Sequence, residues 1–163
     1  MEKTLQTSVT AMAGLVPGSA AAAEVAARET IFLRTQEAED AVLRPADPGG
    51  LSHDLRHALA ARIAAVNAAP ALAARYGQAI VDPELRPFAD PVTGTEDRAL
   101  AAMLAFTDAV ARNPRDFGAG DLSALQTAGV ADADIVRLAE LNAFLAYQLR
   151  LIAGLKLMVE NPA

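Results

Sequence analysis

The sequence predicts an all-α fold, a helical bundle of about six to seven helices, on three observations. About a quarter of the 163 residues are alanine, which has the highest intrinsic helix propensity of all residues. Aromatic residues make up only 4% of the chain, and runs of the β-branched residues that favour strands are scarce. Segments with a helical spacing of apolar residues alternate with breaks that contain proline and glycine. The chain length fits a single domain over residues 1–163, with helices packed closely through small side chains.

Helix signals fill the first half of the chain. A short amphipathic helix is expected to end in a turn at Pro17-Gly18, and Ser19 is a candidate N-cap for a helix over 20–43. Ser52 is the candidate N-cap of the next helix, and a third helix is expected over 70–80, because it begins at a proline. The apolar stripe of the second helix consists of Leu55, Leu59, Ile63 and Val66.

The second half of the chain continues the pattern. The segment 81–94 contains three prolines and is expected to be an extended loop. Thr95 is expected to open a helix that ends at Asn113-Pro114, and Asp121 is the candidate N-cap of a short helix. The last and longest helix is expected over 132–159, with its first aspartate as the N-cap.

Apolar residues cover nearly the whole circumference of the last helix, so it is expected to be either the central helix of the bundle or part of a subunit interface. Asn142 in this helix either fixes the register across such an interface or belongs to a polar stripe with Arg137, Glu140 and Gln148. Because 53% of the residues are hydrophobic, a homo-oligomer based on a dimer or trimer is the expected state. The apolar positions are Ile135, Val136, Leu138, Leu141, Phe144, Leu145, Leu149, Leu151, Ile152 and Leu155.

Composition excludes several classes of function. The chain has no cysteine, so it has no disulfide, no thiolate metal site and no cysteine nucleophile. The 14 basic residues are outnumbered by 20 acidic ones, and this net charge of −6 argues against a nucleic-acid partner. No apolar run approaches the roughly 18 residues of a membrane span, and the sequence MEK at the start lacks the net positive charge of a signal peptide. We therefore expect a cytoplasmic protein without a membrane partner.

Both histidines of the chain, His53 and His57, lie four residues apart on the second expected helix. Residues with this spacing share a helix face and would be able to bind one divalent metal ion together. A stable site needs a third ligand, and no HExxH or similar pattern supplies it. We expect no metal and no cofactor, with an exposed His53 beside a partly buried His57.

The residues around this stretch follow a recognisable order. Leu51-Ser52 is followed by Arg56, by an alanine-rich helix that ends in Asn67, and at once by another helix. The C-terminal half continues with Asp121, Gly129, Asp132, Arg150 and Gly154-Leu155. Over about residues 15–158, this order resembles the carboxymuconolactone decarboxylase and alkylhydroperoxidase D-like proteins, and its second part resembles their peroxidase-related branch. The resemblance implies an alkylhydroperoxidase D-like helical bundle.

The redox site of that family implies a glutamate, a CxxC motif twelve residues later, and a histidine on the following helix. Counted onto this chain, the glutamate position is His57, the cysteine positions are Ala69 and Leu72, and the histidine position is Tyr76, or Arg75 if the spacing is one shorter. All members are replaced, so thiol peroxidase activity is excluded. The spacing of positions 69, 72 and 76 places them on one face of the third helix.

Two functions remain open. The first is a non-catalytic oligomeric or small-molecule-binding member of the family. The second is a cysteine-independent lyase or isomerase for a small organic acid or lactone, with His57 and Tyr76 as candidate catalytic groups and Arg75 or Arg56 on the substrate carboxylate. The structural alternative is that His57 and Tyr76 only fill the core. The candidate pocket consists of His57, Ala69, Leu72, Arg75 and Tyr76.

Overall fold

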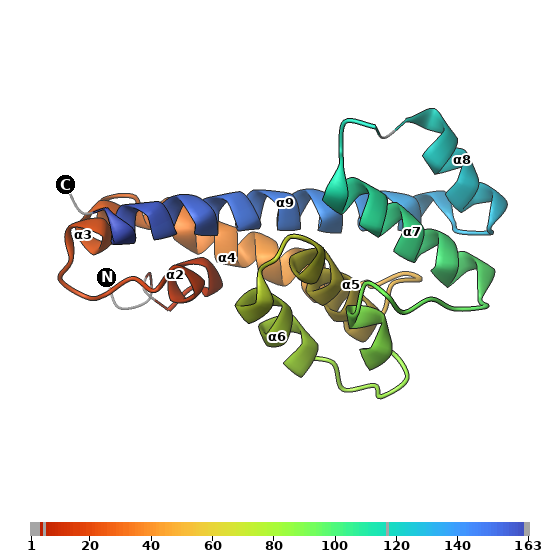
Figure 1. The fold of residues 1–163 in the computed structure, drawn as a ribbon, viewed down its shortest axis with the longest axis horizontal. Helices are drawn as coiled ribbons and strands as arrows, with labels where there is room; N and C mark the ends of the chain where they lie inside the picture. Colours follow the sequence, from red (N-terminus) through yellow and green to blue (C-terminus); the bar gives the residue numbers. More distant parts are fainter. Residues whose placement is uncertain (1–3, 5, 117, 162–163) are drawn as a thin grey trace. The chain divides into compact units, whose positions relative to one another are not determined.

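The structure is a computed structural model that describes residues 4, 6–116 and 118–161, and over these residues it contains helices and no strands (Figure 1). The all-α fold class is therefore confirmed for the described part of the chain. Within that part, no helix combines the length and the apolar character that a membrane crossing requires. Cytoplasmic localisation stays a prediction.

The chain divides into two compact units. The central unit is Val42–Leu145, and the terminal unit combines the described parts of Met1–Ala41 and Ala146–Ala163. Helix α9 (Asp132–Glu160) contributes its first half to the central unit and its second half to the terminal unit. The single domain expected over residues 1–163 stays a prediction.

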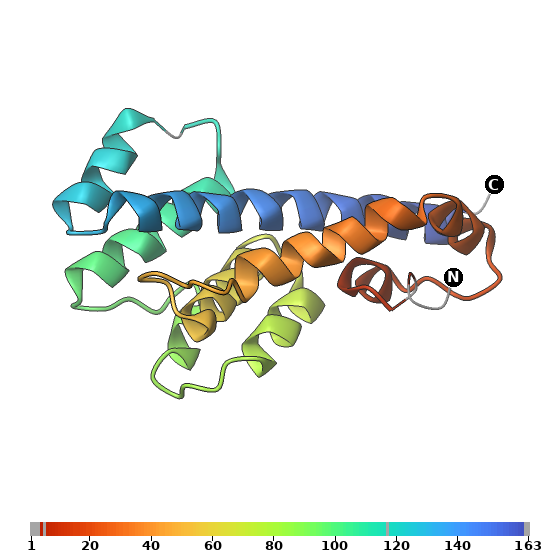
Figure 2. The same ribbon diagram turned by 180° about the vertical axis from the view of Figure 1, so that it is seen from behind.

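The terminal unit is built from helices joined by polar contacts. Figure 2 shows α4 beside the second half of α9, with the two helices running in opposite directions. A hydrogen bond of 2.9 Å between the hydroxyl groups of Thr35 and Tyr147 joins these helices. The elements of this unit are α2 (Ser8–Ala13), α3 (Ala20–Ala27), most of α4 (Glu29–Leu43) and the second half of α9.

Hydroxyl, amide and carboxylate groups meet in the interior of the terminal unit. The Ser8 hydroxyl donates to the Glu39 carboxylate and accepts from Gln148 Nε2 at 3.2 Å, and Ser8 N–H donates to Gln36 Oε1 at 2.8 Å. Ser8, Glu39 and Gln148 are all buried. A buried polar group is tolerated where it is hydrogen-bonded, so these contacts fix how α2, α4 and α9 pack in this unit.

The helix expected over 20–43 is in fact two helices that meet at Arg28. This residue has φ −118° and ψ 27°, which ends α3 at Ala27. The Arg28 guanidinium donates to the carbonyl oxygen of Glu24 at 3.0 Å and pairs with the Glu24 carboxylate at 2.5 Å. Basic side chains can satisfy the last carbonyl groups of a helix. The break therefore occurs without the proline or glycine that would mark it in the sequence.

The central unit is organised around α5. Ten consecutive residues of this helix, from Leu55 to Ala64, are buried, and α6, η1 and α7 all pack against it. The short 3₁₀ helix η1 lies within the segment 81–94, which therefore is not the continuous extended loop that we expected. The elements are α5 (His53–Val66), α6 (Pro70–Gln78), η1 (Arg86–Ala89), α7 (Arg98–Arg112), α8 (Ala119–Thr127) and the first half of α9.

Local capping by side chains explains where several helices begin. Ser19 and Ser52 act as N-caps, as predicted, because each Oγ accepts the backbone N–H three residues on, at 3.1 and 3.2 Å. Helix α7 begins at Arg98 rather than at Thr95, because Asp97 is the N-cap and its Oδ1 accepts an N–H of the first turn at 2.8 Å. The prediction therefore placed the start of this helix two residues too early, since both Thr95 and Asp97 have side chains suitable for an N-cap.

The starts of α8 and α9 also differ from the prediction. Helix α8 begins at Ala119, so Asp121 lies inside the first turn, where its carboxylate accepts the N–H of Gly118 at 2.9 Å. Asp132 is the first residue of α9 rather than its cap. In both cases the aspartate lies in the first helical turn, where the helix dipole favours a negative charge.

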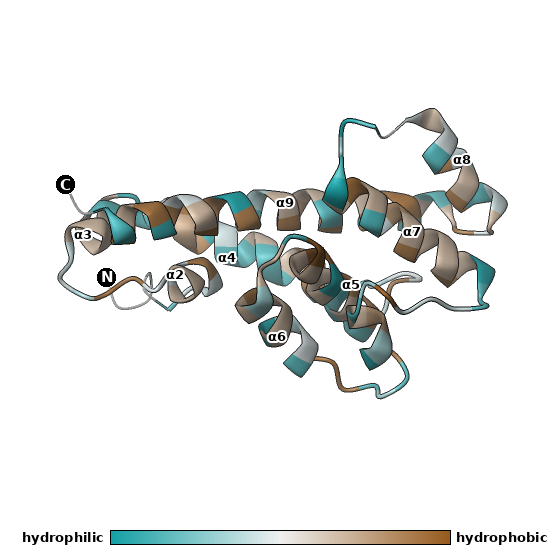
Figure 3. Cartoon of the chain, viewed as in Figure 1, coloured by the Kyte–Doolittle hydropathy of each residue, from teal (hydrophilic) through white to brown (hydrophobic). Residues whose placement is uncertain are grey.

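Helix α9 is not enclosed on all sides. Hydrophobic and hydrophilic residues mix along it (Figure 3), and Val136 and Tyr147 are 58% and 44% exposed. Asn142 is 3% exposed, and its Nδ2 donates to Leu138 O of the same helix at 2.9 Å. Its Oδ1 has no hydrogen-bond partner among the described residues. The hypothesis that Asn142 fixes register across a subunit interface is therefore wrong, because the side chain lies inside the chain.

A turn of two glycines packs against α9 in the central unit. Gly50 N–H donates to Asp134 Oδ1 at 2.9 Å, and Arg137 pairs with Asp134 at 2.9 Å and with Asp47 at 3.1 Å. Gly49 has φ +59°, and a Cβ atom there would lie 2.6 Å from Asp134 Oδ1. A Cβ on Gly50 would collide with the same carboxylate. Only glycine allows the turn to approach this ion pair so closely.

Replacing Gly49 with alanine is expected to lower the free energy of unfolding by about 2 kcal/mol or more, because the side chain adds backbone strain and a collision. Gly94→Ala is the matched control, since a Cβ there meets nothing within 4 Å. The control should change stability by no more than about 0.5 kcal/mol. Urea unfolding followed by circular dichroism measures both values. Equal effects of the two substitutions would contradict the packing of the turn.

Candidate functional site

Helix α5 places three basic side chains in the interior of the central unit. Arg56, His57 and Arg62 are only 2%, 4% and 4% exposed. A buried charged group is stable only when its donors are satisfied or its charge is paired or removed. The partners of each side chain therefore indicate which of the three is available for chemistry.

The Arg56 guanidinium donates to backbone carbonyl groups of the last turn of α4 and of the loop that follows it. Its Nε donates to Leu51 O at 2.9 Å, Nη1 donates to Val42 O at 2.8 Å, and Nη2 donates to Pro48 O at 3.0 Å. Burial lowers the pKa of this guanidinium below its usual value. Arg56 thus holds the connection between α4 and α5 in place, and these three donors are not available to a substrate carboxylate, for which Arg56 was one of two candidates beside Arg75.

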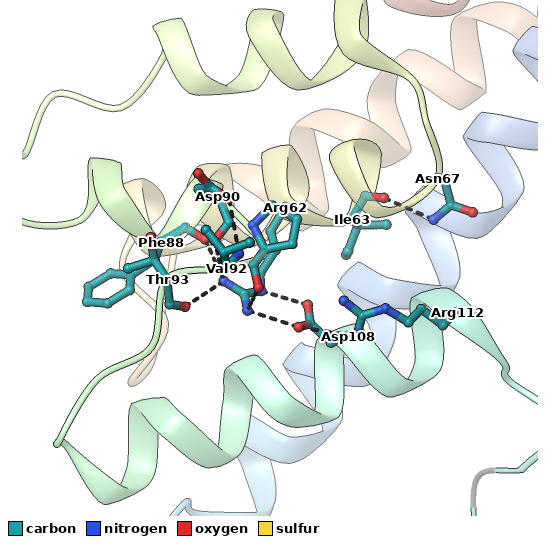
Figure 4. Close-up of polar contacts among 10 residues, drawn as sticks. Arg62, Ile63, Asn67, Phe88, Asp90, Val92, Thr93, Asp108 and Arg112 are labelled. Carbon is teal, nitrogen blue, oxygen red and sulfur yellow. Dashed lines mark hydrogen bonds and ion pairs between the residues drawn. The ribbon is translucent and has the colours of Figure 1, made fainter.

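Arg62 gathers the carbonyl groups of the segment after η1 (Figure 4). Its Nη1 donates to Asp90 O at 2.7 Å, to Thr93 O at 3.0 Å and to Phe88 O at 3.3 Å, while Nη2 donates to Pro91 O at 2.9 Å. These carbonyl groups lie in a segment without regular secondary structure apart from the last turn of η1, so the guanidinium supplies hydrogen bonds that a helix would otherwise provide.

The charge of Arg62 is paired with Asp108 of α7. The carboxylate accepts Nε at 2.6 Å and Nη2 at 2.9 Å, which is a two-pronged contact (Figure 4). The Arg62 and Asp108 side chains are 5% and 13% exposed, and Arg112 approaches the same carboxylate at 3.4 Å from the surface. Arg62 therefore ties α5 to α7 and to the segment between them.

Substitution Arg62→Met is expected to lower the free energy of unfolding by about 3–5 kcal/mol, because it leaves Asp108 and several carbonyl groups buried without their donor. Arg112→Met removes the exposed arginine on the same carboxylate and should cost less than about 1 kcal/mol. Urea unfolding gives the stabilities. Hydrogen exchange should also accelerate over residues 88–93 in the first variant only, and unchanged protection there would contradict the role given to Arg62.

His57 differs from the two arginines because one of its ring nitrogens has no assigned partner. Nδ1 lies 2.7 Å from His53 O of the same helix, and a carbonyl oxygen only accepts, so Nδ1 carries the proton. The neutral imidazole then has its lone pair on Nε2, for which the described residues provide no hydrogen bond. Burial lowers the pKa of His57, and the positive charge of Arg44 lowers it further, although the bond to His53 O acts in the opposite direction.

The structure brings some of the predicted site residues together and separates others. The rings of His57 and Tyr76 contact each other edge-on, with centroids 6.5 Å apart, and Leu72 is buried on the same face of α6. Ala69 lies at the opposite end of α6, where its N–H donates to Ala64 O at 2.9 Å. Two helical turns, about 10 Å, separate it from Tyr76 along the axis. Arg75 is exposed.

The histidine pair itself does not share one ligand. His53 is exposed, and its Nε2 lies 3.0 Å from Pro45 O, so this nitrogen is a donor to the loop before α5. His57 uses Nδ1 on the helix backbone. Within residues 4, 6–116 and 118–161, no group of three or more histidine, aspartate or glutamate side chains is arranged to hold a metal ion.

Comparison with protein-family models, with curated proteins and with solved structures found no match.

Two residues of this region were missed in the sequence. Arg62 was detectable, since it is a charged residue between the apolar positions Leu59 and Ile63, on the stripe side of a helix rich in alanine. The effect of the Arg44 charge on the pKa of His57 was not predictable from the sequence, because it depends on how the loop from α4 to α5 folds back. The carbonyl group of Pro45, next to Arg44, contacts His53 one turn before His57.

The lowered pKa of His57 predicts a specific pH dependence of stability. As pH falls below about 6.5, the unfolded chain takes up a proton at this residue before the folded protein does, so stability falls, with a slope of up to about 1.4 kcal/mol per pH unit. Above pH 7 both states are neutral here and the contribution is constant. Urea unfolding between pH 5.5 and 8 measures the slope.

His57→Gln should flatten this part of the stability curve, whereas His53→Gln, a substitution of the exposed histidine of the same helix, should leave it in place. A slope that survives His57→Gln would assign the proton uptake to another group.

Proposed function

We propose that this protein binds a small organic acid or lactone between α5 and α6, without thiol chemistry. One observation carries the proposal: His57 is buried, its tautomer is fixed by His53 O, and its Nε2 has no hydrogen bond from the described residues. This nitrogen is not among the fully buried side-chain atoms without a partner, so it is open to solvent and to a ligand. A ligand with a hydroxyl or protonated carboxyl group would donate to this nitrogen.

Arg44 is the cation that we assign to a ligand carboxylate. It is exposed, it forms no ion pair or hydrogen bond with a described residue, and its charge acts on His57. Arg56, which the sequence suggested for this role, has three of its five donors on backbone carbonyl groups. A carboxylate held by Arg44 would reach the His57 ring without competing with the backbone.

The resemblance to the carboxymuconolactone decarboxylase and alkylhydroperoxidase D-like proteins remains part of this proposal. The contact between His57 and Tyr76 supports it, because these two positions correspond to the glutamate and the histidine of the family's redox site. Since the chain has no cysteine, the proposed member is redox-inactive and binds its ligand without turnover.

A cysteine-independent lyase or isomerase is the second candidate. The neutral state of His57 favours it, because an imidazole with a free Nε2 can accept a proton from a carbon next to a carboxylate or lactone carbonyl. The Nδ1–H···O bond to His53 keeps Nε2 as the accepting nitrogen. Tyr76, in contact with the ring, is placed to orient the same ligand.

Binding is tested by nuclear magnetic resonance of the imidazole nitrogens, since two histidines give only two sets of signals. Lactate and 4-hydroxybutyrate, which each carry a hydroxyl donor and a carboxylate, are expected at millimolar concentration to shift the Nε2 signal of His57, while neutral γ-butyrolactone should bind more weakly. Arg44→Met should remove the preference for the carboxylates. Arg34→Met is the matched control, because Arg34 pairs with Glu37 on the surface.

Turnover is tested in the same samples. Exchange with D₂O of the protons on the carbon next to the carboxylate of 4-hydroxybutyrate, if it depends on His57, would support the lyase or isomerase, and binding without exchange would support the non-catalytic member. The absence of any His57 shift with all three compounds would reject the proposed site.

A further inference from the structure

An acidic side chain, Asp54, lies beside the ligand site in the first turn of α5. Asp54 and His57 are three residues apart on this helix, so they share a face. The His57 ring leans toward the turn that carries the carboxylate, because its Nδ1 lies 2.7 Å from His53 O. Burial lowers the pKa of His57, and the charge of Asp54 acts on this pKa in the opposite direction, so the two groups lie within electrostatic reach. A ligand at His57 therefore also meets a carboxylate.

The Asp54 carboxylate is held in place by the backbone and still has room for another donor. Its Oδ2 accepts the N–H of Asp82 at 2.7 Å, and this hydrogen bond is the main reason that the pKa of Asp54 is lowered. The side chain is half-buried, and no basic side chain among the described residues forms an ion pair with it. An ionised carboxylate offers about four acceptor positions. Asp54 is therefore a negative charge with free acceptor positions at neutral pH.

Arg44 lies near the same two groups. The carbonyl oxygen of the next residue, Pro45, is 3.0 Å from Nε2 of His53, which places this loop against the first turn of α5. The pKa of His57 is lowered first by burial and also by Arg44, and the pKa of Asp54 is lowered first by a backbone N–H and also by Arg44. The site thus presents one positive charge, one negative charge and one neutral acceptor nitrogen.

We propose that the ligand of this site is a small amino acid in its zwitterionic form, with its carboxylate on Arg44 and its ammonium group between Asp54 and Nε2 of His57. An ammonium group has three N–H donors, so one donates to Nε2 and another to the Asp54 carboxylate. A hydroxyl group has one donor and satisfies only one of these acceptors. This inference rests on the proposed function, because it keeps the contacts at His57 and Arg44, and it adds Asp54 as the residue that selects an amino group.

The ionisation states of ligand and site agree with this arrangement. An alkylammonium group such as that of lysine has an ordinary pKa of about 10.4, whereas burial lowers the pKa of His57 below its ordinary value. The proton therefore stays on the ligand, and Nε2 keeps the lone pair that accepts it in a hydrogen bond. A dicarboxylate fits less well, because its second carboxylate would meet the like charge of Asp54.

Two matched pairs of compounds test the ligand class. Alanine and lactate differ in an ammonium against a hydroxyl group, and 4-aminobutyrate and 4-hydroxybutyrate differ in the same way over a longer chain. In at least one pair, the amino compound is expected to bind about fivefold or more tightly at pH 7, because its donor is charged. Titration of the His57 imidazole nitrogen signals measures the affinities. Binding of the hydroxy acids without tighter binding of either amino compound would overturn this inference alone, and no shift with any of the four would reject the proposed function as well.

Asp54→Asn tests which residue selects the amino group. The amide oxygen can still accept the N–H of Asp82, while the negative charge is lost. This variant is expected to lose the preference for the amino compound and to bind the hydroxy acid at least as tightly as the unmodified protein does. Equal weakening of both compounds would indicate a purely structural role and overturn the proposal, as would a preference that survives the substitution. Asp97→Asn is the matched control, because Asp97 Oδ1 also accepts a backbone N–H, at the start of α7, and it should leave the preference unchanged.

Discussion

The ion pair between Arg62 and Asp108 is the interaction on which the central unit depends. Removing a charged pair from water costs several kcal/mol for each ion, and geometry must recover that cost. Here the carboxylate contacts the guanidinium at two points, and the remaining donors reach four carbonyl groups of residues 88–93. The dependence is mutual. The carbonyl groups of residues 88–93 have few other hydrogen-bond donors, and the buried guanidinium needs these acceptors. The same side chain, Arg62, therefore determines both how α5 packs against α7 and which path the chain takes between these helices.

The same logic extends along α5. Asp54 in its first turn accepts the N–H of Asp82 at 2.7 Å, which lowers the pKa of the Asp54 carboxyl, and Arg56 gathers the carbonyl groups before the helix. Each of these polar side chains satisfies the backbone of an irregular segment. His57 is the exception, since its Nδ1 serves only its own helix and its Nε2 serves no described residue. Comparison with its neighbours on one helix therefore singles out His57 more clearly than the HxxxH spacing does.

Local chemistry made much of the fold predictable. The caps at Ser19 and Ser52 and the proline at the start of α6 act over three or four residues, so their effects are visible in the sequence. The break at Arg28 and the network of Arg62 were not predictable in this way, because they depend on side-chain contacts, the second of them between residues up to 46 positions apart. In the candidate site, too, the local features were predictable and the contacts between distant residues were not. The spacing on α6 correctly placed Leu72 and Tyr76 on the buried face, but it carried no information on which residue of α5 each would meet. The antiparallel course of the two helices brings Tyr76 to His57 and Ala69 to Ala64.

The glycines of this chain differ in whether a contact within the chain requires them. Gly49 and Gly50 are required by contacts within the chain, since any side chain there meets Asp134 or Arg137. Gly154 has no such contact, and yet it occupies a helix position where almost any other residue would be more favourable.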